Sequence, residues 1–153
     1  MKYYVSGALQ GSDNLKEARA VYERAGKAIQ TAGAMAYVPH TNTDPETNVS
    51  LDSHSVFRTD LDEIKKADAL VVFLNEPSLG VGAEIAIALS MGKQLLPVVF
   101  SGKPYSRFVG GMLEAHGVSV QQYKTVSELE DIIAKHVSDH LAGDESQNLC
   151  NAV

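Results

Sequence analysis

The segment Asp68-Ala-Leu-Val-Val-Phe-Leu74 is a continuous apolar run, and a turn follows it at Pro77. A run of this kind is typical of a central strand that is covered on both faces of a parallel sheet. The next residues, Pro77-Ser-Leu-Gly-Val-Gly-Ala-Glu84, open a helical pattern that extends to about Met91, where Gly92 ends it. A strand followed directly by a helix is the repeating unit of an α/β fold.

Strand-like and helical segments alternate on both sides of this unit. We expect the other strands at residues 3–6, 35–38, 94–100 and 118–123. We expect helices from a cap at Ser12 or Asp13 to residue 32, and at 53–67, 106–116 and 127–141, with a long polar loop at 39–52. The pattern predicts a doubly wound five-stranded parallel sheet of order 2-1-3-4-5, with helices on both faces. It also predicts one domain over residues 1–141 and a disordered tail over 142–153.

The composition is that of an ordinary globular protein. The 153 residues carry a formal net charge of −6, which gives no electrostatic footprint for a nucleic acid polymer. A small anion can still bind at a helix N-terminus. The single cysteine, Cys150, cannot form an intrachain disulfide, which favours a reducing compartment.

Neither a membrane nor a metal is indicated. The N-terminus has no signal-peptide apolar region, and no apolar run reaches the roughly 20 residues of a membrane-spanning helix. We therefore expect a cytoplasmic protein. The five histidines, at positions 40, 54, 116, 136 and 140, form no compact ligand pattern, so we expect neither a metal nor a cofactor.

The predicted strand order places a ligand crevice at the carboxyl ends of the first and third strands. The loops there contain Gly7 and the pair Gly80 and Gly82, which would let a ligand approach the backbone. Glu84 follows at the start of a helix, before an apolar stripe. It either acts chemically or merely complements the helix dipole, and the residues alone leave both readings open.

A second acid, Asp60, lies on the helix that precedes the central strand. Two carboxylates at one pocket suit glycosidic cleavage, because one attacks the anomeric carbon and the other handles a proton on the leaving group. Asp60 can equally be a solvated surface acid. Tyr3 and Tyr4 face opposite sides of the first strand, and either one can be a core residue or orient a carboxylate.

Taken together, these residues resemble the nucleoside 2-deoxyribosyltransferase superfamily, and most closely its nucleotide-cleaving N-hydrolase branch. Four stretches of the sequence carry the resemblance: Tyr3-Tyr-Val-Ser-Gly7, Arg58-Thr-Asp-Leu61, Ala67-Asp-Ala-Leu-Val-Val72 and Pro77-Ser-Leu-Gly-Val-Gly-Ala-Glu84. The resemblance implies a flavodoxin-like fold and three roles. Glu84 would attack C1' of the sugar, Asp60 would assist departure of the base, and Tyr3 would position the nucleophile.

Ser78 indicates the substrate class. The transferases that this chain resembles carry an aspartate at that position, which binds the sugar's 5'-hydroxyl, whereas a serine hydroxyl can accommodate a 5'-phosphate. The resemblance also implies that Ser106 reaches a phosphate in a neighbouring subunit's site, within a homodimer or larger assembly. The arginine common after the first strand in such hydrolases is missing, and Lys16 or Arg107 could supply its charge.

Three functions are consistent with the sequence. The first is hydrolysis of a nucleoside 5'-monophosphate to free base and sugar phosphate through a glycosyl-enzyme intermediate on Glu84. The second is transfer of deoxyribose between free bases. The third is a non-catalytic nucleotide-binding module.

Overall fold

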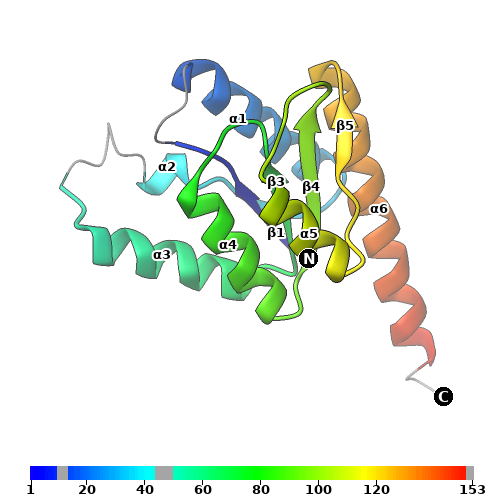
Figure 1. The fold of residues 1–153 in the computed structure, drawn as a ribbon. Coiled ribbons are helices and arrows are strands. Elements are labelled where there is room, and N and C mark those ends of the chain that lie inside the picture. Colours follow the sequence, from blue (N-terminus) through cyan, green and yellow to red (C-terminus); the bar gives the residue numbers. More distant parts are fainter. Residues whose placement is uncertain (10–13, 44–49, 151–153) are drawn as a thin grey trace.

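The computed structural model describes residues 1–9, 14–43 and 50–150. It contains one parallel sheet with the strand order β2-β1-β3-β4-β5 (Figure 1). The strands are β1 (Lys2–Ser6), β2 (Met35–Tyr37), β3 (Ala69–Phe73), β4 (Gln94–Phe100) and β5 (Gln121–Tyr123). Every neighbouring pair is parallel. The predicted fold and strand order are confirmed.

Helices occupy most of the chain between the strands. They are α1 (Leu15–Thr31), α2 (His40–Thr43), α3 (Ser53–Lys66), α4 (Leu79–Ser90), α5 (Arg107–Ala115) and α6 (Val126–Cys150). The residue that caps α1 is Asn14, whose side chain accepts a hydrogen bond from the Glu17 N–H. The caps predicted at Ser12 or Asp13 lie outside the described residues. The short helix α2 occupies part of the segment predicted as loop.

The last helix is longer than its sequence indicates. The pattern predicts an end at Leu141, whereas α6 continues to Cys150 and its end projects past the sheet in Figure 1. Residues 142–150, predicted as the start of a disordered tail, are therefore helical, and 151–153 lie outside the described residues. None of the helices in the described ranges has the length and apolar character needed to cross a membrane.

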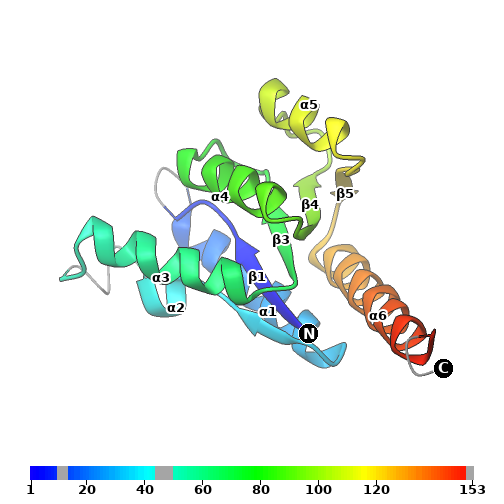
Figure 2. The same cartoon turned by 90° about the horizontal axis from the view of Figure 1, so that it is seen from below.

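The helices cover the sheet in two layers (Figures 1 and 2). On one face, α1 and α6 pack on the sheet through the buried side chains Tyr22, Ala25, Ile29, Leu129, Ile133 and Val137. On the other face, α3, α4 and α5 contribute Ile64, Val81, Ile85, Ala88 and Leu113. All five residues of β3 are buried, as its continuous apolar sequence predicts for a central strand.

Alternation along β1 decides which side chains reach which layer. Tyr3 and Val5 belong to the core under α1 and α6, and Tyr4 belongs to the core under α3 and α4. Ser6 has the same parity as Tyr4, so both point to the α3 and α4 side. Because the strands are parallel, the loops after β1 and β3 leave the sheet at the same edge.

The Tyr3 side chain contacts two histidines of α6 on the face of the sheet that this helix covers. Its hydroxyl lies 3.0 Å from His136 Nδ1 and 3.1 Å from His140 Nδ1. One hydroxyl has a single proton to donate, so the two imidazoles differ in their role toward it. Burial and the neighbouring His140 lower the pKa of His136, although Asp139 partly opposes this.

This histidine makes folding stability depend on pH. Because the pKa of His136 is lower in the folded chain, the unfolded chain binds the proton more readily. Stability that is complete above the ordinary histidine pKa of about 6.5 is therefore lost as the pH falls through the lowered value. We predict that the urea midpoint drops between pH 7.5 and 5.5, and that His136→Gln reduces the drop. The control is His54→Gln, because His54 is exposed. If the urea midpoint falls with pH equally in the two variants, the prediction is contradicted.

Candidate active site

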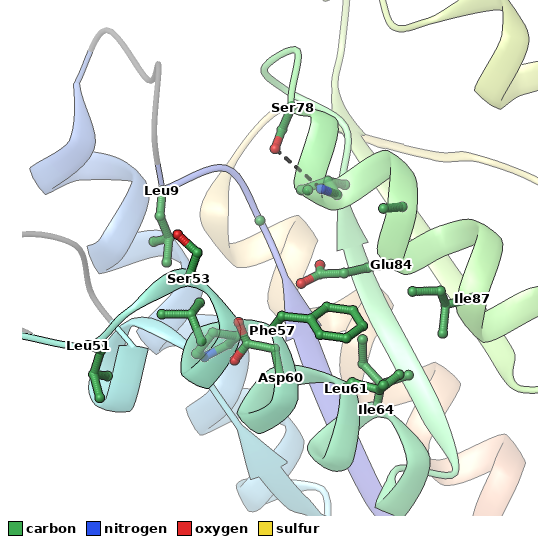
Figure 3. A pocket seen from close by; sticks show the side chains of 16 residues that line it. Leu9, Leu51, Ser53, Phe57, Asp60, Leu61, Ile64, Ser78, Glu84 and Ile87 are labelled. Carbon is green, nitrogen blue, oxygen red and sulfur yellow. Dashed lines mark hydrogen bonds between the residues drawn. The ribbon is translucent and has the colours of Figure 1, made fainter.

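A cavity of about 530 Å³ opens at the carboxyl ends of β1 and β3 (Figure 3). Its walls come from the loop after β1, from Pro39 and Leu51 between β2 and α3, from α3, and from α4 as far as Ile87. This is the crevice that the strand order predicts for a doubly wound sheet. The cavity has the size of an ordinary small-molecule site.

Glu84 projects from α4 into this cavity, and both of its carboxylate oxygens are hydrogen-bonded. The Tyr4 hydroxyl donates to Oε1 over 2.7 Å, and the Ser6 hydroxyl donates to Oε2 over 2.5 Å. The carboxylate thus bonds to side chains of β1 instead of to the N–H groups that begin α4. Its position is not that of an acid that only complements the helix dipole.

The environment of Glu84 acts on its pKa in two opposing ways. Burial raises the pKa because it disfavours the charged form, and the negative charge of Asp60 raises it further. The hydrogen bonds from Ser6 and Tyr4 favour the carboxylate and lower the pKa. Burial is the largest effect, so the net direction is upward. The same surroundings raise the pKa of the Tyr4 phenol, chiefly by burial, so this phenol stays protonated as a donor.

Asp60 lines the same cavity from α3 and is half-buried. Figure 3 shows its carboxylate and that of Glu84 directed into one space from two helices. The other acids of α3 point elsewhere: Asp62 pairs with Lys65 over 3.1 Å, and Glu63 pairs with Lys2 and Lys66. The structure thus brings together the two carboxylates that the sequence singled out.

The prediction that Tyr3 positions Glu84 is wrong. Tyr3 lies on the opposite face of β1, where its hydroxyl contacts His136 and His140. Tyr4 makes the hydrogen bond to Glu84 instead. The cause is the two-residue period of a strand, which sends adjacent tyrosines to opposite faces of the sheet.

Ser78 stands at the edge of the cavity as the N-cap of α4. Its hydroxyl accepts a hydrogen bond from the Val81 N–H over 3.3 Å, and its carbonyl accepts one from the Gly82 N–H over 3.1 Å. Among the described residues, the N–H groups of Leu79 and Gly80 have no hydrogen-bond partner, and N–H groups of this kind at a helix start can bind an anion. Gly80 also lines the cavity.

Gly82 and Ser106 lie apart from this space. Both line a second cavity of about 320 Å³ between α4 and α5, which Ser78 and Val81 also border. Ser106 is exposed and caps α5 by accepting from the Val109 N–H over 3.4 Å. A single chain therefore does not bring Ser106 to Glu84.

Gly7 lines the main cavity and has a packing role as well. A Cβ at this position would lie 2.3 Å from the ring of Tyr22, so a larger residue would displace that ring. The Tyr22 hydroxyl donates to the Ala8 carbonyl over 3.2 Å and thereby fixes the start of the loop after β1. Gly7 thus lets the core pack closely beneath the cavity.

The rest of the lining is largely apolar and carries no described cation. Lys16 and Arg107, considered as replacements for the missing arginine, are not among the residues that line the cavity. The most prominent apolar group is Phe57 of α3, whose side chain is 54% exposed. A flat, exposed ring at the edge of a pocket can stack on a planar ligand.

The sequence reasoning missed Ser6, and of the two tyrosines that it left open as possible partners of a carboxylate it selected Tyr3 in place of Tyr4. A usable signal was present, because Ser6 is a polar residue at the carboxyl end of a buried strand, next to the predicted crevice. Residues two apart share a strand face, so the serine identifies Tyr4 and not Tyr3 as the tyrosine on the cavity side.

The chain resembles curated proteins along most of its length. A 5-hydroxymethyl-dUMP N-hydrolase from Danio rerio is 27% identical over 141 residues, which are 89% of this chain and 95% of that protein. The protein of the same name from Esox lucius is 26% identical over 142 residues, with 89% and 95% covered.

A solved structure has the same fold. The CMP N-glycosidase BcmB of Clostridium botulinum superposes with a TM-score of 0.67 at 18% identity, over 89% of this chain and 99% of that one. The family model described as nucleoside 2-deoxyribosyltransferase matches residues 4–142. The chain therefore belongs to the nucleoside 2-deoxyribosyltransferase family.

Proposed function

We propose that this protein hydrolyses the N-glycosidic bond of a nucleoside 5'-monophosphate, releasing the free base and the sugar 5-phosphate. The observation that carries the proposal is the half-buried Glu84 carboxylate, held by two hydroxyl groups and facing Asp60 across a ligand-sized cavity. Enzymes that cleave glycosidic bonds commonly use a pair of carboxylates at one cavity. The relatives are named as 5-hydroxymethyl-dUMP N-hydrolases, and these names support cleavage of an N-glycosidic bond in a nucleoside monophosphate.

The proposed reaction has two steps. An oxygen of Glu84 attacks C1' of the sugar, the bond from C1' to the base nitrogen breaks, and the electron pair leaves with the base as Asp60 delivers a proton to it. Water, deprotonated by Asp60, then attacks C1' and breaks the bond to Glu84. The carboxylate is regenerated and the sugar phosphate leaves. Tyr4 holds the nucleophile through both steps.

We assign the parts of the substrate to different regions of the cavity. The 5'-phosphate is assigned to Ser78 and the first-turn N–H groups of α4, where the positive end of the helix dipole favours an anion. Gly80 and Gly7 leave room there for the sugar phosphate. The base is assigned to the apolar wall around Phe57, which offers a stacking surface.

Transfer of deoxyribose would use the same residues. It differs from hydrolysis in that a second free base, and not water, takes the glycosyl group from Glu84. Incubation of the protein with a deoxynucleoside and a second free base separates the two activities. A new nucleoside would establish transfer, whereas release of base from the monophosphate alone would establish hydrolysis. A screen of the four deoxyribonucleoside and four ribonucleoside monophosphates identifies the substrate.

We predict that Glu84→Gln abolishes base release, by at least roughly a thousandfold, while the fold is retained. Since the folded pKa of Glu84 is raised, stability present below its ordinary pKa is lost as the pH rises through the raised value. Removing the ionised group should therefore leave Tm at neutral pH unchanged or raise it by about 2–4 °C. Base release by chromatography and thermal melts check both effects.

The matched control is Asp62→Asn, because Asp62 is an exposed acid of the neighbouring helix that pairs with Lys65. It should keep wild-type turnover, whereas Asp60→Asn should lower kcat by roughly 10²–10⁴-fold. Base release that survives in Glu84→Gln would overturn the assignment of the nucleophile.

We predict that Ser78→Asp raises KM for the monophosphate by roughly tenfold or more and does not raise KM for the free nucleoside. Aspartate caps a helix as well as serine does, so the stability of α4 is preserved and only the repulsion of the phosphate is added. Ser78→Ala removes both the cap and the phosphate contact, and serves for comparison. Equal KM values for the monophosphate in wild type and Ser78→Asp would contradict the phosphate assignment.

A homodimer is part of the proposal, with Ser106 near the neighbouring subunit's site. Two large apolar side chains on the α4 and α5 side support it, Leu79 at 96% exposed and Phe108 at 81% exposed. Exposed apolar groups of this size are typical of an interface.

We predict that Phe108→Asp converts a dimer to a monomer in light scattering and weakens monophosphate turnover. The control is Met35→Asp, because Met35 is exposed on the edge strand β2, which β1 and β3 separate from β4. A Phe108→Asp protein that stays dimeric would refute this surface.

A further inference from the structure

The carboxylate of Glu84 has one hydroxyl donor on each oxygen. Tyr4 binds Oε1 and Ser6 binds Oε2, and the two donors are residues i and i+2 of β1. The carboxyl group is thereby held at both oxygens from one rigid strand. A single donor would leave it free to rotate about its last bond, whereas two donors at different oxygens fix its plane.

Ser6 occupies a special place in this arrangement. It is fully buried, it does not line the cavity, and its hydroxyl donates to Glu84. A substrate in the cavity therefore does not touch Ser6. Any effect of Ser6 on the reaction must pass through the carboxylate that it holds.

We propose that Ser6 is a positioning residue for the nucleophile, which fixes the orientation of the Glu84 carboxylate through a hydrogen bond to Oε2. The inference rests on the proposed function in one respect, the role of Glu84 as nucleophile. Ser6 acts with Tyr4, and each hydroxyl controls one oxygen. Without Ser6 the second oxygen loses its donor inside a buried site.

The charges around Glu84 explain why this second donor matters. The titratable groups that face Glu84 are Tyr4 from β1 and Asp60 from α3, and the phenol of Tyr37 from β2 stacks on Tyr4 at 5.6 Å. None of these groups is a cation, and none of the ion pairs formed between described residues includes Glu84. Burial and Asp60 both favour the protonated, non-nucleophilic form of Glu84, so the two hydroxyls are what oppose protonation.

A purely structural role for Ser6 makes a different prediction. If the serine only satisfied its own hydroxyl in the core, removing it would change stability and nothing else. If it supports the ionised nucleophile, removing it raises the pKa of Glu84. The acid limb of the pH profile of kcat/KM then moves to higher pH, because this limb reports the free enzyme's ionisation.

The test is Ser6→Ala, read out in two ways on the full chain. The first is the pH profile of base release from the best monophosphate, whose acid limb should shift upward by about one pH unit, with KM at the optimum pH unchanged. The second is a carbon-13 NMR titration of the Glu84 carboxyl carbon without substrate, assigned by its absence in Glu84→Gln. It should show an upward shift of the same size.

Two further variants complete the design. Ser6→Thr keeps the hydroxyl and should restore both the wild-type pH limb and the wild-type titration, while Ser6→Cys, a near-isosteric weak donor, should shift both in the direction of alanine by less. Tyr3→Phe is the matched control, because it removes a buried hydroxyl from the same strand on the opposite face. It should leave the pKa of Glu84 as in wild type.

The outcomes separate the inference from the proposed function. An unshifted Glu84 titration in both Ser6→Ala and Ser6→Cys overturns the role of Ser6, whatever the activity. A shifted titration in a protein whose wild type releases no base supports the control of Glu84 by Ser6 and overturns hydrolysis instead. A shift of equal size in Tyr3→Phe would also overturn the inference, because it would show a general effect of the core.

Discussion

A carboxylate that is partly withdrawn from water needs hydrogen-bond donors, and β1 supplies two hydroxyl groups to Glu84. The pleat of the strand gives Tyr4 and Ser6 a common face, and the parallel sheet brings that face beneath the start of α4. The geometry of the candidate site is therefore set by regular secondary structure. Sites built on strands and helices are held more firmly than sites built on loops.

Each face of the sheet carries a hydrophobic core, but the polar groups on the two faces differ. Beneath α1 and α6 the Tyr3 hydroxyl lies against two histidines, His136 and His140. Beneath α3 and α4 the polar groups converge on the cavity. One strand, β1, supplies the hydroxyls for both, so adjacent tyrosines serve the folding of one layer and the proposed chemistry of the other.

The sequence predicted the fold well because the apolar pattern of β3 and the strand and helix alternation are local signals. The resemblance pointed to Glu84, Asp60 and Ser78, and all three line the cavity. The Tyr3 assignment followed the resemblance and failed because adjacent strand residues face opposite sides of the sheet, so that Tyr4, and not Tyr3, shares the face of Ser6. The end of α6 was missed because polar residues can continue a helix without an apolar stripe.

Ser6 escaped detection for a related reason. A serine in a strand carries no sign of its partner, which here lies 78 residues away on α4. Long-range hydrogen bonds of this kind depend on the topology, and they become visible only after the strands are ordered. The part of a site that faces the substrate is easier to read from sequence than the part that supports it.

The charges that line the cavity affect the rate at which an anionic ligand associates. Among the lining residues that the structure describes, the charged ones are the acids Asp60 and Glu84, and the whole chain has a formal charge of −6. A phosphate monoester carries roughly −1.5 to −2 at neutral pH, so the long-range field of the protein opposes its approach. Salt screens this repulsion over about 10 Å at 0.1 M. For the proposed substrate, added salt would therefore accelerate association, the reverse of the usual behaviour of proteins that steer a nucleotide with positive charge.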